Sequence, residues 1–174
     1  MHTHRKRPFW ALRISRYLVV SLLLTFALSS AADYGYDPDA NPAASFQQAL
    51  QQSAQQEKLV LLVFGSEWCP DCRSLNKKMA QAPLAATVQD NFVVAHIDIG
   101  NWDKNMAFTE QFGEPVAQGI PSIAIIAPDG TLLYVSEAGE FASARSAQLE
   151  ALDKWFTDKL AQIAQPSGAA ADKQ

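Results

Sequence analysis

The sequence predicts an α/β sandwich, in which helices cover a central sheet, and three observations lead to this fold class. Short apolar runs of strand length alternate with longer segments whose apolar residues have helical spacing. A Pro-Asp-Gly turn at 128–130 separates the last two apolar runs, as in a β-hairpin. Hydrophobic residues make up 48% of the 174 residues, enough for the core of one domain. Strands that alternate with helices in this way are typical of α/β folds.

The first half of the predicted domain alternates helix, strand and helix. After a turn-rich arm at 33–42, residues 43–56 are good helix formers with one apolar face. Residues 59–64 are all apolar, which favours a strand that is buried on both faces. Apolar residues four positions apart predict a helix over 70–81, and a further helical turn or two is expected over 83–89.

The second half adds three strands and two helices. A strand is expected over 92–99 and a helix over 103–112. Residues 120–128 predict a third apolar strand, and residues 131–137 are expected to pair with it across the tight turn. A long amphipathic helix over 146–165 closes the domain, because its apolar residues recur at helical spacing.

The first 32 residues differ from the rest and predict a secretory signal peptide. Five Arg or Lys residues precede an apolar run of 12 residues, and small residues follow at Ser30 and Ala32. We expect cleavage after Ala32, with Ala31 as the next choice. An uncleaved membrane anchor is the alternative, although the apolar run is short for a bilayer span. The layout is typical of exported bacterial proteins, so we expect a periplasmic location, where disulfides can persist.

The chain that would remain after cleavage is acidic. All 18 acidic residues lie from Asp33 onward, but five of the 14 basic residues lie in the leader, which leaves a formal net charge of −9. Such a charge argues against nucleic acid and against anionic membrane surfaces as partners. Residues 33–165 are the expected folded domain, and residues 166–174, rich in small and polar residues, predict a disordered tail.

Cys69 and Cys72 are the only cysteines in the chain, and they lie where a buried strand is expected to become a helix. A helix N-terminus presents unpaired N–H groups and the positive end of the helix dipole, and both favour a thiolate. The thiolate is the nucleophile, so Cys69 is expected to be the exposed, attacking residue and Cys72, one turn on, the resolving one. Pro70 suits the first turn, where its missing N–H would have no partner.

Three other interpretations of the pair are open at this point. A structural zinc site usually needs four ligands, and the chain after the leader offers two cysteines and one histidine, His96. A structural disulfide would close a very short loop and constrain little of the unfolded chain. The pair could also be a coincidence in an inert fold.

Two motifs together resemble the thioredoxin superfamily. The segment "FGSEWCPDC" is followed far downstream by "GIPS", and the resemblance covers roughly residues 43–163. It implies a thioredoxin-like domain over 33–165: a three-layer sandwich with a central mixed sheet flanked by helices. It also implies that Trp68 covers the active-site face. Ile120 would offer its backbone to an extended substrate, beside a cis Pro121. The alternative for Pro121 is a residue that merely starts a strand.

A narrower resemblance comes from three shorter segments. "YDPDANP", "WCPDCR" and "GEFASAR" are similar to segments of exported bacterial thioredoxin-like proteins, some of them described as disulfide isomerases. The chain also departs from thioredoxin, which has a buried aspartate where this sequence has Val63. We therefore consider that His96, on the neighbouring strand, assists proton transfer at Cys72, because histidine titrates in the useful range. The alternative is a strand histidine with no such role.

Asp71 bears on the direction of the reaction. A carboxylate beside Cys69 should oppose the thiolate, and a less stabilised thiolate makes the dithiol a better reductant. Arg73 and nearby lysines could offset this charge, and Asp71 could instead be a solvated residue that favours the helix start. Four side chains remain, for which we expect packing roles at Trp102, Trp155 and Phe156 and a solvated loop acid at Glu67. Glu140 and Arg145 are a candidate ion pair.

The predicted function is a periplasmic thiol–disulfide oxidoreductase, a reductase or isomerase rather than an oxidase. Its substrates would be disulfide-containing exported proteins, and an upstream membrane thiol donor would supply electrons. No bound cofactor and no metal are expected, and the arm at 33–42 is too short for a dimerisation domain, so we expect a monomer. The alternative is a non-catalytic module that binds polypeptides and has a merely structural disulfide.

Overall fold

The computed structural model describes residues 35–137 and 139–165, which belong to one compact unit. The predicted signal peptide at 1–32 and tail at 166–174 lie outside the described residues. None of the helices in the described ranges combines the length and the apolar character that a membrane span needs.

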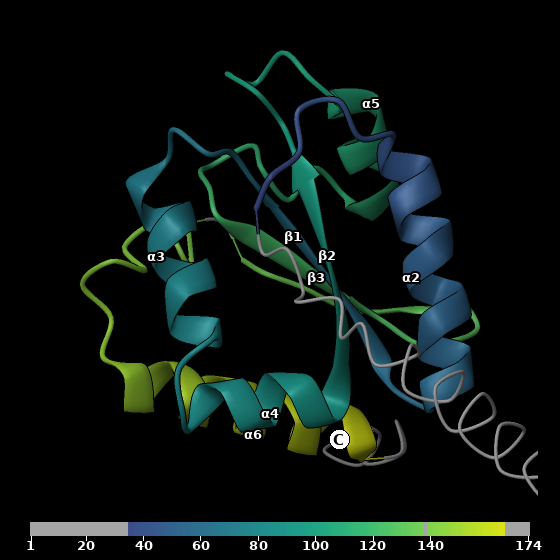
Figure 1. The fold of residues 1–174 in the computed structure, drawn as a ribbon, viewed down its shortest axis with the longest axis vertical. Coiled ribbons are helices and arrows are strands. Elements are labelled where there is room, and N and C mark those ends of the chain that lie inside the picture. Colours follow the sequence, from purple (N-terminus) through teal and green to yellow (C-terminus); the bar gives the residue numbers. More distant parts are fainter. Residues whose placement is uncertain (1–34, 138, 166–174) are drawn as a thin grey trace, which may run out of the picture. The chain divides into compact units, whose positions relative to one another are not determined.

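A four-stranded mixed sheet in the order β2-β1-β3-β4 forms the centre of the fold (Figure 1). Strand β1 (Leu59–Gly65) pairs in parallel with β2 (Phe92–Asp98) and antiparallel with β3 (Ser122–Ile126). The edge strand β4 (Leu132–Val135) pairs antiparallel with β3 across the predicted hairpin turn. Because β1 is central, every residue after Leu59 in it is buried, which explains its unbroken apolar sequence.

Helices cover both sides of this sheet, so the predicted α/β sandwich with a mixed sheet is confirmed (Figure 1). Figure 1 shows α3 and α2 on opposite sides of the strands, and α4 packs against α6. The helices have the following bounds: α2 (Pro42–Gln56), α3 (Pro70–Met79), α4 (Leu84–Asn91), α5 (Met106–Thr109), the 3₁₀ helix η2 (Glu110–Phe112) and α6 (Leu149–Ala164).

Local chemistry sets the start of α2. Its first residue is Pro42, and the side chain of the preceding Asn41 accepts the Ala44 N–H at 3.0 Å. At the other end, Glu57 has a left-handed backbone with φ 55°, and Lys58 then begins the short link to β1.

The predicted helix over 103–112 is wrong in its extent. The structure has only the short α5 and η2 there, after a turn in which Trp102 and Asn105 have φ values of 60° and 55°. The Asn105 side-chain amide donates to the Asp98 carbonyl at 2.8 Å. This bond ties the turn to the end of β2, and the left-handed backbone delays the helix until Met106.

Candidate active site

The two cysteines lie at the start of α3, as the sequence predicts. Cys69 is the N-cap residue, and Pro70 is the first helical residue. The Cys69 sulfur accepts the Cys72 N–H at 3.3 Å, in the place where a serine or aspartate oxygen usually caps a helix. Both residues are thiols in this structure, and Cys72 is completely buried. Cys69 is only 4% exposed, so the expectation that the attacking cysteine is exposed is wrong.

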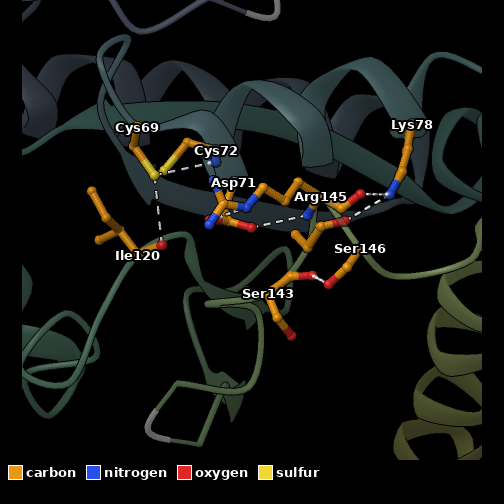
Figure 2. A network of polar contacts seen from close by, with 9 residues as sticks. Cys69, Asp71, Cys72, Lys78, Ile120, Ser143, Arg145 and Ser146 are labelled. Atoms are coloured by element: carbon orange, nitrogen blue, oxygen red, sulfur yellow. Dashed lines mark hydrogen bonds and ion pairs between the residues drawn. The ribbon is translucent and has the colours of Figure 1, made fainter.

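The structure also places Ile120 beside Cys69 (Figure 2). The Cys69 thiol donates to the Ile120 carbonyl oxygen with a sulfur–oxygen distance of 3.6 Å, although the residues are 51 positions apart. The Ile120–Pro121 peptide bond is cis, and Pro121 is buried just before β3. The two motifs that the sequence analysis singled out therefore meet at one point.

Cys72 differs from Cys69 in its surroundings. Burial raises the pKa of the Cys72 thiol far above its ordinary value, and the neighbouring Cys69 raises it further. The Ser66 backbone and the Tyr36 side chain act in the opposite direction and lower the pKa of Cys72. In the dithiol form Cys72 is therefore a protonated, solvent-shielded thiol.

Tyr36 is a site residue that the sequence analysis missed. Tyr36 comes from the turn-rich arm before α2, yet only 3% of the residue is exposed. Its backbone N–H donates to Glu67 Oε1 at 2.8 Å, so the exposed Glu67 also holds the arm. The nearest sequence signal is the "YDPDANP" segment, which has no periodicity that would indicate burial.

His96 lies on β2 opposite Val63 of β1. Its Nε2 is 2.9 Å from Asn76 Oδ1 of α3, and its ring meets the Tyr36 ring edge to face, with centroids 5.1 Å apart. His96 thus neighbours Tyr36 and Asn76, and its role in proton transfer at Cys72 stays a prediction.

Asp71 is buried, so its interpretation as a solvated residue is wrong. Only 7% of Asp71 is exposed, and Figure 2 shows its carboxylate directed at Arg145. The carboxylate accepts the Arg145 backbone N–H at 2.9 Å and lies 3.7 Å from Arg145 Nε. The predicted pairing of Arg145 with Glu140 is also wrong, because the Glu140 carboxylate instead accepts hydrogen bonds from Tyr134 and Trp155.

Lys78 makes a second link between α3 and the loop that contains Arg145 (Figure 2). Its ammonium donates to the carbonyl oxygens of Ala144, Arg145 and Ala147 at 2.7, 3.1 and 2.6 Å. We name the loop from Gly139 to Gln148 the α3-bound loop. It is held by Asp71 near the start of α3 and by Lys78 near its end.

A family model described as thioredoxin-like matches residues 41–128. The chain belongs to the thioredoxin-like family. The resemblance inferred from the cysteine and Ile-Pro motifs is therefore confirmed. No curated protein matches the sequence.

Two solved structures illustrate the relationship of this thioredoxin-like chain to others. The disulphide isomerase from Xylella fastidiosa Temecula1 is 33% identical, with a TM-score of 0.68 over 71% of this chain and 94% of that one. The oxidised C-terminal domain of DsbD from Neisseria meningitidis is 18% identical, with a TM-score of 0.52 over 69% of this chain and 97% of that one. The second similarity concerns the fold alone.

Two tryptophans form an exposed pair beside the thioredoxin-like site. Trp68 and Trp102 are 47% and 44% exposed, and their ring centroids lie 5.6 Å apart. Trp68 directly precedes Cys69 in the sequence. Its indole N–H donates to the Gly100 carbonyl at 2.9 Å, which fixes the orientation of the ring. Trp102 packs against Trp68 as a partly exposed residue rather than in the core, whereas Phe156 is fully buried and packs against Trp155.

Metal ligands do not cluster in the described part of this thioredoxin-like chain. Within residues 35–137 and 139–165, no group of three or more His, Cys, Asp or Glu side chains could hold a metal ion. The chemistry that the described site offers is that of its two sulfur atoms.

Proposed function

We propose that the protein is a thiol–disulfide oxidoreductase that reduces or isomerises disulfides in exported proteins. The observation that carries this proposal is the asymmetry of the cysteine pair. Cys69 caps α3 beside the Ile120 carbonyl, while Cys72 lies fully buried one turn further in. We infer that Cys69 attacks the substrate disulfide and that Cys72, which is completely buried, attacks only Cys69.

In the reductive direction, the Cys69 thiolate attacks one sulfur of a substrate disulfide. A mixed disulfide forms, and the other substrate sulfur leaves as a thiolate. Cys72 then attacks Cys69, which releases the reduced substrate and leaves a Cys69–Cys72 disulfide. As an isomerase, the protein would leave the second step to a thiol of the substrate itself. The Ile120 backbone would pair with the extended substrate, with Pro121 and Trp68 beside it.

Two features support reduction or isomerisation rather than oxidation. The raised pKa of Cys72 means that a Cys72 thiolate adds no stability to the reduced form, and a reduced form without such stabilisation is the better electron donor. The Xylella relative is named a disulphide isomerase. The proposal includes export by the predicted leader, a periplasmic location, a monomeric protein and reduction by a membrane thiol donor.

The reduction potential of the Cys69–Cys72 pair tests this function. We would equilibrate the purified protein with glutathione buffers and measure the oxidised fraction. We expect a potential near that of thioredoxin, about −270 mV, whereas a value near −120 mV would indicate an oxidase.

A second assay separates catalysis from binding. We expect the double variant Cys69→Ala/Cys72→Ala to lose all reduction and isomerisation of a disulfide substrate. If that variant keeps full biological activity, the protein is a polypeptide-binding module and its cysteines are structural.

A further inference from the structure

The hydroxyl of Tyr36 is buried beside the resolving cysteine. A Cβ atom added to Gly65 would lie 2.4 Å from Tyr36 Oη and 2.8 Å from Cys72 Sγ, so both polar atoms flank one point above Gly65. Among the buried side-chain polar atoms of the described residues, Tyr36 Oη alone has no hydrogen-bond partner in the dithiol form. Buried hydroxyls normally have a partner, so this one indicates an acceptor that another state of the site supplies.

The arm holds this hydroxyl in place by contacts elsewhere on Tyr36. The backbone N–H donates to Glu67 Oε1 at 2.8 Å, and the ring packs edge to face on His96 with an interplanar angle of 85°. Neither contact uses the hydroxyl. The backbone and the ring of Tyr36 are therefore both held, and its hydroxyl oxygen is left available to the sulfur of Cys72.

We propose that the Tyr36 hydroxyl donates a hydrogen bond to Cys72 Sγ when that sulfur becomes a thiolate, and so promotes resolution of the mixed disulfide. This inference rests on the proposed function. In that step Cys72 first loses its proton to solvent. Its sulfur then forms a bond to Cys69 Sγ, the bond from Cys69 to the substrate breaks, and the substrate sulfur leaves with the electron pair and takes a proton from solvent.

The chemistry of the phenol suits a donor rather than a base. Burial raises the pKa of Tyr36 well above its ordinary value, and the adjacent Cys72 and Cys69 raise it further, so the hydroxyl keeps its proton. Hydrogen bonds to an ionised acceptor are stronger than those between neutral groups. A thiolate at Cys72 would therefore be a stronger acceptor for this hydroxyl than the Cys72 thiol is.

Stopped-flow reaction with 5,5′-dithiobis(2-nitrobenzoic acid) isolates the step. Attack by Cys69 releases the first thionitrobenzoate at a rate that depends on reagent concentration. Attack by Cys72 on Cys69 releases the second at a rate that does not. For Tyr36→Phe we expect the second phase to slow about 3- to 10-fold, since the loss of thiolate outweighs the gain in nucleophilicity. The first phase should stay within about 2-fold.

The pH profile of the second phase is the decisive readout. The titratable side chains that face Tyr36 are Cys69 just before α3, Cys72 of α3 and His96 of β2, with Glu67 at its backbone N–H, and all are retained in the variant. A profile that moves to higher pH in Tyr36→Phe therefore reports the hydroxyl. Tyr134→Phe is the matched control, because its hydroxyl bonds to Glu140 instead, and we expect its two phases to equal those of the wild type.

A second variant keeps the test independent of folding. 3-Fluorotyrosine at position 36 has nearly the same shape but is a stronger donor, and it should move the profile to lower pH. Unchanged second phases in Tyr36→Phe, or equal slowing of both phases, would overturn the role of Tyr36. If Tyr36→Phe does not fold, an unmoved profile with 3-fluorotyrosine overturns it instead. A wild type without a second, reagent-independent phase would contradict the proposed function itself.

Discussion

Asp71 lies between the two cysteines in the sequence but serves a neighbouring loop in the structure. Its carboxylate accepts the backbone N–H of Arg145, which is 74 positions away, and the Arg145 guanidinium lies at 3.7 Å (Figure 2). The sequence could place Asp71 beside Cys69, but it could not show which way the carboxylate would turn. The charge of this residue is therefore partly directed to the α3-bound loop.

Substitution of Asp71 measures this anchoring. We expect Asp71→Ala to lower the free energy of unfolding by about 1–3 kcal/mol, because the Arg145 N–H would lose its acceptor. Arg145→Ala is the matched control. It keeps that backbone bond and removes only an ion pair whose arginine side chain is 65% exposed, so we expect a loss of less than about 1 kcal/mol. Urea unfolding of both variants checks the prediction, and equal losses would contradict it.

The site residues that the sequence could predict are those that belong to short local motifs. Cys69, Cys72 and the Ile120-Pro121 pair belong to short motifs whose chemistry is local or is implied by the family. Tyr36 belongs to no motif of this kind. Its burial depends on Glu67 and on the space above Gly65, and both contacts are distant in sequence. Such a residue becomes visible only when the arm is folded onto α3.

At the scale of the element, the start of α3 combines a helix cap with a nucleophile. Cys69 accepts the Cys72 N–H through sulfur, which is a weaker acceptor than oxygen. The residue that begins the helix is thus also the one that would attack the substrate. Removal of its side chain should therefore have a structural effect as well as a chemical one.

Two variants separate these effects. Cys69→Ser and Cys69→Ala both remove the thiol, so neither should form a mixed disulfide. The serine oxygen can still cap α3, whereas alanine cannot, and we expect Cys69→Ala to be less stable by about 1 kcal/mol. Thermal or urea unfolding under reducing conditions measures the difference. Equal stability of the two variants would show that the cap contributes nothing.

Element prediction succeeded where the apolar pattern was strong. The strand expected over 59–64 is β1 (Leu59–Gly65), and the helix expected over 43–56 is α2 (Pro42–Gln56). It failed over 103–112, because the spacing of apolar residues does not show the left-handed backbone of Trp102 and Asn105. Side-chain hydrogen bonds within the turn and to Asp98 at the end of β2 hold it, and helix propensity does not contain them.

At the scale of the whole molecule, a buried thiol and a buried phenol link the stability of the protein to pH. The pKa values of Cys72 and Tyr36 are both raised in the folded protein, chiefly by burial. The unfolded chain therefore loses these protons first, at pH values near about 8.5 for cysteine and about 10 for tyrosine. Their contribution is complete below about pH 8.5 and is lost as the pH rises.

We therefore expect the free energy of unfolding of the dithiol form to fall between about pH 9 and 11, by up to about 1.4 kcal/mol per pH unit for each group. Cys72→Ala should show a shallower fall that begins only near about pH 10, because Tyr36 remains. Urea titrations with a phosphine reductant measure both curves. Parallel curves for the two proteins would contradict the raised pKa of Cys72.

The sheet order is a property of the whole chain that local patterns do not contain. The alternation of strands and helices predicts an α/β sandwich, but β3 pairs antiparallel with β1 rather than in parallel. That orientation carries Ile120, just before β3, to the start of α3. The mixed sheet was implied by the resemblance to the family, and the structure agrees with it.

The limits of the family match and those of the site do not coincide. The match covers residues 41–128, whereas Tyr36 lies beside Cys72 on one side and α3 is anchored through Arg145 on the other. A fragment trimmed to the match would keep both sulfurs yet lose both neighbours, together with β4 and α6. Assays of such a trimmed fragment would report on a thiol pair without its neighbours Tyr36 and Arg145. Fragments made for variant libraries or domain grafts should therefore run from before Tyr36 to beyond Ala164.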